Sequence, residues 1–397
     1  MKLLVFAHTP PPHHGQSYAV KTLLENFGGD CRKQKIPSPN PYGIECYHVN
    51  ARFSRGLADI GEFQGAKILL IFWFWLQAVW VRFRYGVENF YYVPAPGKPV
   101  ALYRDWLVLL LCRPFFKKII LHWHAAGLAK WLETVGSNRT RSLTHNRMKY
   151  ADLSIVLSEF NRQDAEKQLA QKIIVVSGGI SDPCPQLAEK VLPRRRALAA
   201  ARKKILAGEV SSPNDPAGIV RVLYVALASR AKGVFDAIEG VALANQRSPL
   251  QFRLTVIGGF ASDAEETELR EFVRQGGWQD AVEILGFVPA GQKNQAFADA
   301  DIFCFPTYYS AENQPGNLIE AMAFGLPIIT TRWRSIPEML PENYPGIVDP
   351  KSPAQIAAAL RLLPASDFSG PLREIFLRCF TLERHLAAMA AAIRSVE

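Results

Sequence analysis

The sequence predicts an α/β protein built from two doubly wound, Rossmann-like domains that face a cleft. The chain has 397 residues, which exceeds the size of one ordinary domain. Hydrophobic residues make up 49% and charged residues 21%, so the chain can bury a substantial core. Short apolar segments alternate with helix-length segments in both halves, which is typical of βαβ units with parallel sheets.

The expected elements fall into two sets along the chain. In the first half, strands are expected at 2–7, 89–93, 119–123, 153–157 and 173–176. In the second half, they are expected at 220–226, 253–258, 282–285, 301–305 and 327–331. Helices are expected at 102–113, 233–246, 263–275, 317–324 and, amphipathic and Ala-rich, at 381–395.

The boundary between the two sets lies in residues 185–217. This stretch contains two basic runs, 194–196 and 202–204, and a Ser/Pro/Asn/Asp cluster at 211–216. Such a composition predicts a linker that carries a short helix. The expected organisation is therefore an N-terminal domain 1–184, a linker 185–217, a C-terminal domain 218–378, and a last helix 379–397 that packs back on the N-terminal domain.

Cysteine usage and hydropathy predict a cytoplasmic protein. The six cysteines form no CxxC pair and no metal-ligand spacing, which favours reduced thiols. The longest apolar run, 68–81, has 14 residues, fewer than the roughly 18–20 needed to span a bilayer. The apolar stretch after Lys2 is too short for a signal peptide and reads as a buried strand.

The charge is unevenly placed. Residues 1–185 contain 23 Lys and Arg against 13 Asp and Glu, whereas the remainder contains 23 of each. The basic half also contains the aromatic stretches 72–75 and 90–92. This pattern indicates an anionic partner, either nucleic acid or an anionic membrane surface, unless the aromatics are core and the cations a solvated face. A nucleic-acid partner is disfavoured because no recognisable binding module is present.

The segment 312–331 contains the most informative residues. Glu312 and Glu320 stand eight positions apart, where a loop passes into a helix that is followed by an apolar strand. A carboxylate one turn inside the helix can accept two hydrogen bonds from a ribose diol. A carboxylate in the preceding loop can hold sugar hydroxyls. Glu320 is therefore a candidate for binding a ribose and Glu312 for binding a sugar.

The start of this helix is a candidate anion site. Pro315 suits a first helical turn, because its missing N–H is not needed there. The amides of Gly316, Asn317 and Leu318 are expected to be free and to point into the cleft. Free amides and the positive end of the helix dipole are suited to a diphosphate.

These residues resemble the family 4 retaining glycosyltransferases, whose fold is GT-B. The family signature is E-x7-E followed by A-M-A-x-G-x-P and a strand, and residues 312–331 match it through 321–327, which read AMAFGLP. The resemblance covers nearly the whole chain. It is firm from about 150 to 340 and weak in 20–118. It implies GT-B architecture, with a donor-binding second domain and an acceptor-side first domain.

The resemblance assigns further donor contacts in the second domain. Lys232, in a strand-loop-Lys-Gly segment, would neutralise the diphosphate, and Arg230 is the nearby arginine that could assist it. The family's usual Gly-Arg after the strand is Ala226-Leu227 here, so the role of Arg230 stays open. Gly258 ends a strand in a glycine turn. Phe287 and Val288 lie in the segment that holds the base.

The resemblance also assigns residues in the first domain. Gly15 falls in a loop that is Gly-rich in the family, although Gln16 stands where a second Gly is common. His13 and His14 are either cleft residues or surface residues. The strand at 119–123 is followed by His124, which is favoured over His122 for contact with the donor sugar. Strand alternation places both on one face and does not choose between them.

The implied activity is retaining transfer of a hexose from a UDP- or GDP-sugar to a lipid-linked or polysaccharide acceptor. The resemblance implies Glu312, His124 and Lys232 as the catalytic residues. The expected place is the inner face of the plasma membrane, with no cofactor and no metal. The pair Asp299 and Asp301 is not interpreted as a metal site, because it falls where a helix runs into a buried strand. The alternatives are a nucleotide-sugar 2-epimerase of GT-B fold and a non-catalytic nucleotide-sugar-binding membrane module.

Overall fold

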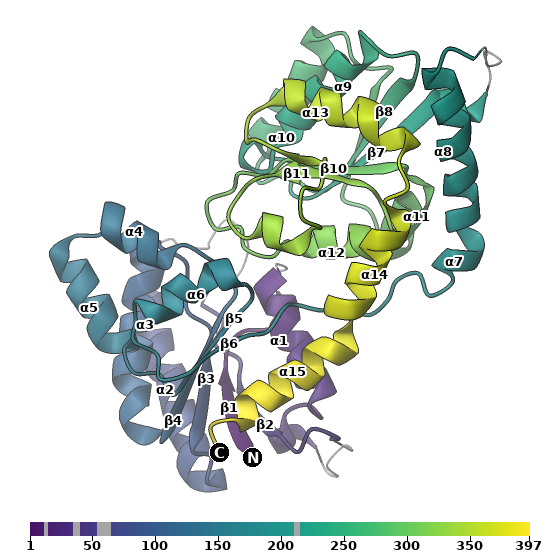
Figure 1. Ribbon diagram of the computed structural model, residues 1–397. Helices are drawn as coiled ribbons and strands as arrows, with labels where there is room; N and C mark the ends of the chain where they lie inside the picture. The colour runs from purple at the N-terminus through teal and green to yellow at the C-terminus, as the bar shows by residue number, and fades with distance from the viewer. Residues whose placement is uncertain (12–14, 35–39, 54–64, 210–214) are drawn as a thin grey trace. The chain divides into compact units, whose positions relative to one another are not determined.

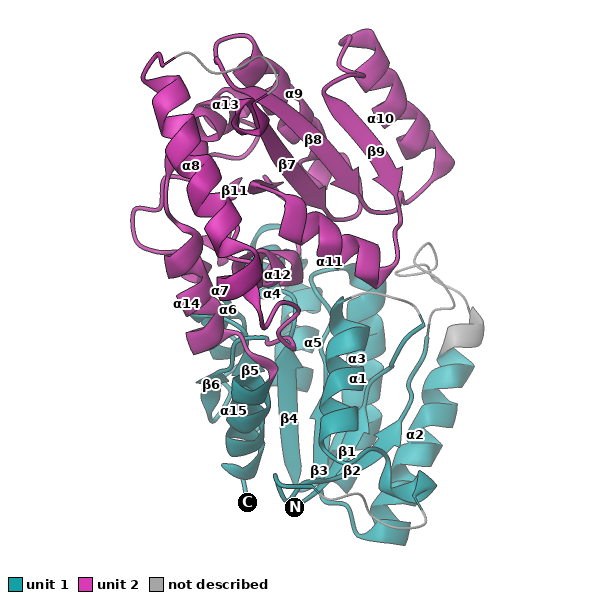
Figure 2. Ribbon diagram, turned by 90° about the vertical axis from the view of Figure 1, so that its right-hand side faces the viewer, with its two compact units in different colours: residues 1–178, 383–397 teal, residues 179–382 magenta. Residues whose placement is uncertain are grey.

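The computed structural model describes residues 1–11, 15–34, 40–53, 65–209 and 215–397 (Figure 1). Within these residues the chain forms two six-stranded sheets, and every strand pair in them is parallel. The predicted α/β class with two Rossmann-like domains is confirmed. The chain divides into a first unit, 1–178 with 383–397, and a second unit, 179–382 (Figure 2).

The first unit is built on a sheet of strand order β2-β1-β3-β4-β5-β6. Its central strands are apolar on both faces, and Leu3, Leu4 and Val5 are fully buried, as expected for a parallel sheet covered by helices on both sides. The strands are β1 (Lys2–Phe6), β2 (Glu45–Val49), β3 (Asn89–Tyr92), β4 (Lys118–Trp123), β5 (Leu153–Val156) and β6 (Ile173–Val175). The helices are α1 (Gly15–Asn26), α2 (Gly65–Tyr85), α3 (Pro99–Cys112), α4 (Leu128–Thr134), α5 (Asn138–Met148), α6 (Glu159–Glu166) and the C-terminal α15 (Leu382–Arg394).

The second unit repeats this architecture with strand order β12-β11-β10-β7-β8-β9. Strand β10 lies directly beside β7, with Ile302 opposite Val222, although about 80 residues separate them. The strands are β7 (Ile219–Val225), β8 (Gln251–Ile257), β9 (Val282–Gly286), β10 (Ile302–Phe305), β11 (Ile328–Thr331) and β12 (Ile347–Val348). The helices are α7 (Leu187–Lys190), α8 (Leu192–Leu206), α9 (Val234–Asn245), α10 (Asp263–Gln275), α11 (Ala290–Asp299), α12 (Gly316–Ala323), α13 (Pro353–Leu362) and α14 (Ser369–Cys379).

The predicted linker 185–217 lies within the second unit. Residues 185–209 belong to the second unit, which begins at Gly179, and contain α7 and α8. Buried arginines of α8 hold it there. The guanidinium of Arg195 donates to the carbonyl of Phe297 at 2.9 Å, and that of Arg202 donates to Asp301 at 2.8 Å. The basic runs suggested a solvated linker because the sequence does not show which cations of an amphipathic helix are buried.

Two further differences concern single elements. The edge strands β2 and β12 were not predicted, although the other strands were. Helix α2 continues beyond Val81, and its window Ile68–Tyr85 is long and apolar enough to cross a membrane, by length and composition. A core helix can pass the same test, but only 17% of this window is buried.

The Arg202–Asp301 pair yields a test of the role of α8. Both side chains are almost fully buried, and Asp301 also accepts from the amide of Arg221 at 2.9 Å. Arg202→Met should lower the free energy of unfolding by about 3 kcal/mol, because it leaves a buried carboxylate without its cation. Urea unfolding measures this, with the exposed Lys203→Met as the matched control. Equal stabilities of the two variants would contradict the assignment.

Candidate functional site

The candidate site lies at the carboxyl edge of the second sheet. The loops after β7 and β10 and the first turn of α12 (Gly316–Ala323) meet there. In doubly wound sheets the carboxyl ends of the strands are where ligands bind. The order β10-β7 explains why side chains distant in sequence meet at this edge.

An ion pair joins the two loops. The Nζ atom of Lys232 lies 2.7 Å from Oε2 of Glu312, and the Thr307 hydroxyl donates to the same oxygen at 3.1 Å. Glu312 is 8% exposed and the Lys232 side chain 21%. Lys232 and Glu312 are two of the three predicted catalytic residues, and the structure places them in direct contact.

A glycine permits this approach. Gly233, with φ +80°, caps the turn that carries Lys232, and a Cβ at this position would lie 2.2 Å from the carbonyl oxygen of Pro306. The two loops are further joined by the amide of Tyr308, which donates to the carbonyl of Ala231 at 2.9 Å. The Lys-Gly pair in the sequence therefore has a physical reason: the glycine lets the lysine turn pack against the loop of Glu312.

Two tyrosines surround the lysine. Its Nζ lies 4.5 Å from the ring centroid of Tyr309, a cation–π distance. Burial and the charge of Glu312 raise the pKa of Tyr309, so this ring is neutral at physiological pH. The hydroxyl of buried Tyr224 lies 3.2 Å from the carbonyl oxygen of Lys232 and thereby fixes the turn.

The second carboxylate lies one turn inside α12. Glu320 is half-buried and paired with Lys293 of α11, a contact that the sequence analysis missed. The one signal for Lys293 was that it is the only charged residue in the first two turns of α11. Thr307 and Tyr309 gave no signal, because uncharged loop residues are interpretable only once their neighbours are known.

The helix start differs in detail from the prediction. Pro315 is the N-cap of α12, and the amide of Leu318 is not free, since it donates to the carbonyl of Pro315 at 3.2 Å. The amides of Gly316 and Asn317 stand in the first turn, where no intrahelical acceptor exists. The side chain of Asn317 donates to the carbonyl of Val225 at 2.8 Å and ties the helix start to the end of β7.

Arg230 lies differently from Lys232. Its guanidinium pairs with the exposed Glu268 at 2.6 Å and stacks on the ring of Phe235, with 3.9 Å to the centroid. Neither contact joins it to Glu312. Lys232 therefore supplies the cation at the ion pair, and Arg230 stays a prediction as a donor contact.

The predicted glycine turn and base segment lie on neighbouring strands. Gly258 follows β8 with φ +147°, and a Cβ there would lie 1.7 Å from the carbonyl oxygen of Ala226, so no other residue fits. Its amide donates to the carbonyl of Gly286 at the end of β9. Beyond β9, Phe287 is 87% exposed, whereas Val288 is buried. The aromatic ring of Phe287 is therefore accessible to a ligand, whereas the buried Val288 could contact one mainly through its backbone.

The predicted residues of the first unit lie at the start of α1 and at the end of β4. Gly15 is the exposed first residue of α1, with open space around it. The rings of His122 and His124 lie 4.1 Å apart, on one side as strand alternation predicts. His122 is buried against the Tyr91 hydroxyl, and burial lowers its pKa, whereas His124 is half-buried. His13 and His14 lie outside the described residues.

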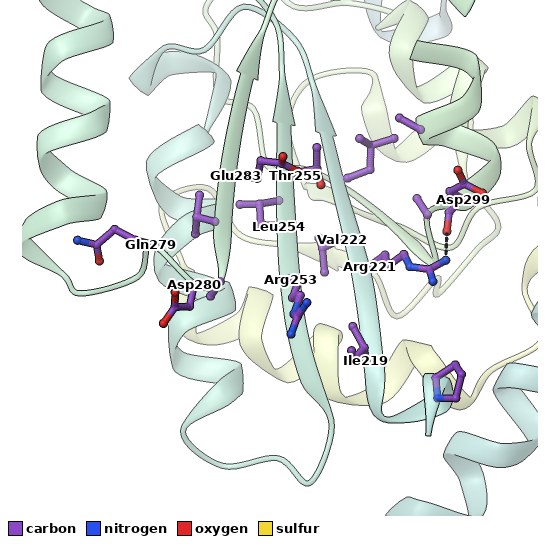
Figure 3. Close-up of a pocket in the computed structure, with 16 residues that line it drawn as sticks. Ile219, Arg221, Val222, Arg253, Leu254, Thr255, Gln279, Asp280, Glu283 and Asp299 are labelled. Atoms are coloured by element: carbon purple, nitrogen blue, oxygen red, sulfur yellow. Dashed lines mark hydrogen bonds between the residues drawn. The ribbon is translucent and has the colours of Figure 1, made fainter. Parts of the chain in front are cut away.

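A pocket in the second unit lies away from these groups (Figure 3). It is lined by residues from the first halves of β7, β8 and β9 and from the end of α11, including Arg221, Arg253 and Glu283. Arg221 donates to the carbonyl of Asp299 across it, at 3.3 Å. Because the carboxyl edge carries the ion pair and the helix start, we place the functional site there and not in this pocket.

Comparison with known proteins gives a family match within the second unit. Residues 220–365 match the family model described as Glycosyl transferases group 1. The amylovoran biosynthesis glycosyltransferase AmsK of Erwinia amylovora is 33% identical over 147 residues, 36% of this chain and 35% of that protein. The putative colanic acid biosynthesis glycosyltransferase WcaL of Escherichia coli K12 is 31% identical over 148 residues, again 36% and 35%. The matched segment thus spans about a third of the length of these relatives.

Solved structures match over the full chain. Anabaena Alr3699/HepE in complex with UDP aligns over 100% of both chains, with a TM-score of 0.65 and 15% identity. The sucrose-phosphate synthase of Thermosynechococcus elongatus covers 100% of this chain and 99% of its own, with a TM-score of 0.67 and 17% identity. At these identities the likeness shows the fold, and the predicted GT-B fold is confirmed.

The role of Gly233 can be tested against a matched glycine. Gly277 has a similar φ of +68°, but a Cβ there would meet open space. Gly277→Ala should cost about 1–2 kcal/mol of unfolding free energy from the left-handed backbone. Gly233→Ala should cost clearly more, since it adds the clash with Pro306. Urea unfolding of both variants measures the difference, and equal losses would show that the close approach is not required.

Proposed function

We propose that the protein is a retaining glycosyltransferase. It transfers a hexose from a UDP- or GDP-sugar to a hydroxyl of a lipid-linked or polysaccharide acceptor at the cytoplasmic face of the membrane. The observation that carries the proposal is the Lys232–Glu312 ion pair beside the first turn of α12. The match of residues 220–365 to the group 1 glycosyl transferases supports it, as do the polysaccharide roles in the names of AmsK and WcaL.

The charges of the pair suit the bond that would break. In a nucleotide sugar, the anomeric carbon is joined to a phosphate oxygen. As this bond breaks, positive charge grows on the sugar ring and negative charge on the leaving phosphate. Lys232 and the first-turn amides of α12 would stabilise the phosphate, and Glu312, 2.7 Å from Lys232, would face the ring. The cation Lys232 would thus lie near the negative charge on the phosphate, and the anion Glu312 near the positive charge on the sugar ring.

Retention follows in this proposal from the leaving group itself. The departing phosphate oxygen would help to deprotonate the acceptor hydroxyl on the same face of the sugar. This route asks for no separate protein base, and Glu312 would orient the sugar and stabilise the ring. His124 would contact the donor sugar. Lys293 would hold the carboxylate of Glu320 for the ribose.

Replacement of Glu312 tests the catalytic assignment. Glu312→Gln keeps the shape but removes the charge, so kcat should fall on the order of 10²–10³-fold. Nucleoside diphosphate affinity should be retained, because Lys232 remains. Radiolabelled sugar transfer to membrane extract measures the rate and calorimetry the affinity. Glu342→Gln, an exposed carboxylate in the same unit, is the control.

The outcomes separate the proposed activity from its rivals. Near-normal transfer by Glu312→Gln would overturn the role of this residue. A new epimer formed from donor alone would identify a nucleotide-sugar epimerase. Donor binding without turnover on any acceptor would identify a non-catalytic module. The anomeric configuration of the product, determined by NMR, decides retention.

A thermodynamic cycle that combines a variant of Glu320 with a modified nucleotide tests whether this residue binds the ribose. If its carboxylate accepts two hydrogen bonds from the ribose diol, Glu320→Ala should weaken nucleoside diphosphate binding about 30-fold, for hydrogen bonds worth about 1 kcal/mol net each. A dideoxyribose analogue should lose similar affinity for the wild-type protein but little more for Glu320→Ala. Calorimetry with UDP, GDP and their analogues measures all four combinations. Additive losses would show that Glu320 does not hold the ribose.

A further inference from the structure

Helix α2 (Gly65–Tyr85) exposes an apolar face to solvent. Its exposed large side chains include Leu69 at 73%, Trp73 at 59% and Phe83 at 70%. Apart from Ile68 and Leu70 near its start, the exposed large apolar side chains of α2 fall, at about 100° per residue, within an arc of about 100° along one side of the helix. We call these residues the outer stripe: Leu69, Phe72, Trp73, Leu76, Trp80 and Phe83.

The opposite face of α2 is fixed to the first unit. Ile71, Ala78 and Val81 are buried in its core. The indole of Trp75 donates to the carbonyl of Leu111 at 2.9 Å, and the guanidinium of Arg82 donates to that of Phe115 at 2.8 Å. The helix therefore cannot cross a bilayer without leaving this core. An occupant of the outer stripe must meet the helix side-on.

The charged residues of α2 itself are all positive. The sequence of α2 contains no Asp or Glu, and Arg84 is exposed at its end. The next acid, Glu88, is paired with Arg82 at 3.3 Å and with Lys117 at 2.9 Å. Residues 1–185 contain 23 Lys and Arg against 13 Asp and Glu. Two copies meeting through this face would bring like charges together, whereas an anionic surface would be attracted.

We propose that the outer stripe docks on an anionic lipid bilayer, with α2 lying in the plane of the interface. Its Trp and Phe side chains suit the headgroup boundary, where amphipathic aromatic rings are enriched. Leu69 and Leu76 would enter the acyl region, and Arg84 would pair with lipid phosphate. The proposal does not depend on sugar transfer, since it rests on the surface of the first unit.

Vesicle sedimentation tests the docking. The wild-type protein should bind phosphatidylcholine vesicles containing 30% phosphatidylglycerol and bind pure phosphatidylcholine vesicles more weakly. The triple variant L69Q/W73Q/L76Q should lose at least about tenfold in partitioning. The control V135Q/L143Q/Y150Q replaces exposed apolar side chains elsewhere in the same unit and should bind normally. Arg84→Glu should lower only the binding to anionic vesicles. Circular dichroism checks that each variant is folded.

Depth measurements separate an in-plane from a spanning helix. Quenching of tryptophan fluorescence by lipids brominated at different depths is compared for Trp73→Phe, Trp80→Phe and the wild type. An in-plane helix places both indoles at one shallow depth. A spanning helix separates them by about 10 Å, for seven residues at 1.5 Å each, and that result would overturn the proposal.

Two other results would also overturn it. Equal sedimentation of the outer-stripe and control variants would show that the stripe is not the contact. A wild-type dimer that ignores vesicles, and that L69Q/W73Q/L76Q converts to a monomer in light scattering, would assign the stripe to a second copy of this chain. Neither result bears on the Glu312→Gln transfer assay, so failure of docking and failure of the proposed function are distinguishable.

Discussion

The candidate site depends on one close approach between two loops. Strand β10 lies beside β7, so the loops that leave their carboxyl ends are neighbours. Only a residue without a side chain at Gly233 lets these loops touch, and this contact places Lys232 on Glu312. The tyrosines beside the lysine and the start of α12 are arranged around that contact. A shift of about 1 Å here would separate the charges on which the proposed chemistry relies.

Buried polar contacts and a close glycine approach hold the framework around this contact together. Buried Arg195 and Arg202 of α8 fasten this helix to the carbonyls and the carboxylate at the end of α11 and the start of β10. Gly258 brings the turn after β8 against the loop after β7. Charged side chains usually lie on the surface, but these two arginines are buried and form hydrogen bonds within the second unit. Long cationic side chains can do this because one guanidinium satisfies several buried carbonyls at once.

Helix α2 is unusual because it is apolar on two faces. A soluble helix normally has one apolar face, whereas α2 is apolar on the face that packs and on the face that does not. Burial of the first face explains the fold of the first unit. The outer stripe adds only edge contacts to that fold, such as Phe83 against Phe115 and Phe72 against Trp75. A large exposed apolar patch of this kind marks an interaction surface. If both proposals hold, the first unit would attach the protein to lipid and the second unit would bind the donor.

The sequence by itself determined the strand-helix alternation, ten of the strands, and the E-x7-E segment. These features depend on hydrophobic periodicity and turn residues, which are properties of neighbouring positions in the chain. It also identified Lys232 and Glu312 separately. Their ion pair, the partnership of Lys293 with Glu320, and the membership of α8 in the second unit were decided only by the tertiary structure. These contacts join residues 27 to 102 positions apart, and no local sequence pattern indicates which side chains a crossover connection will bring together. The same holds for α2, since composition shows an apolar helix but only packing shows which face is left uncovered.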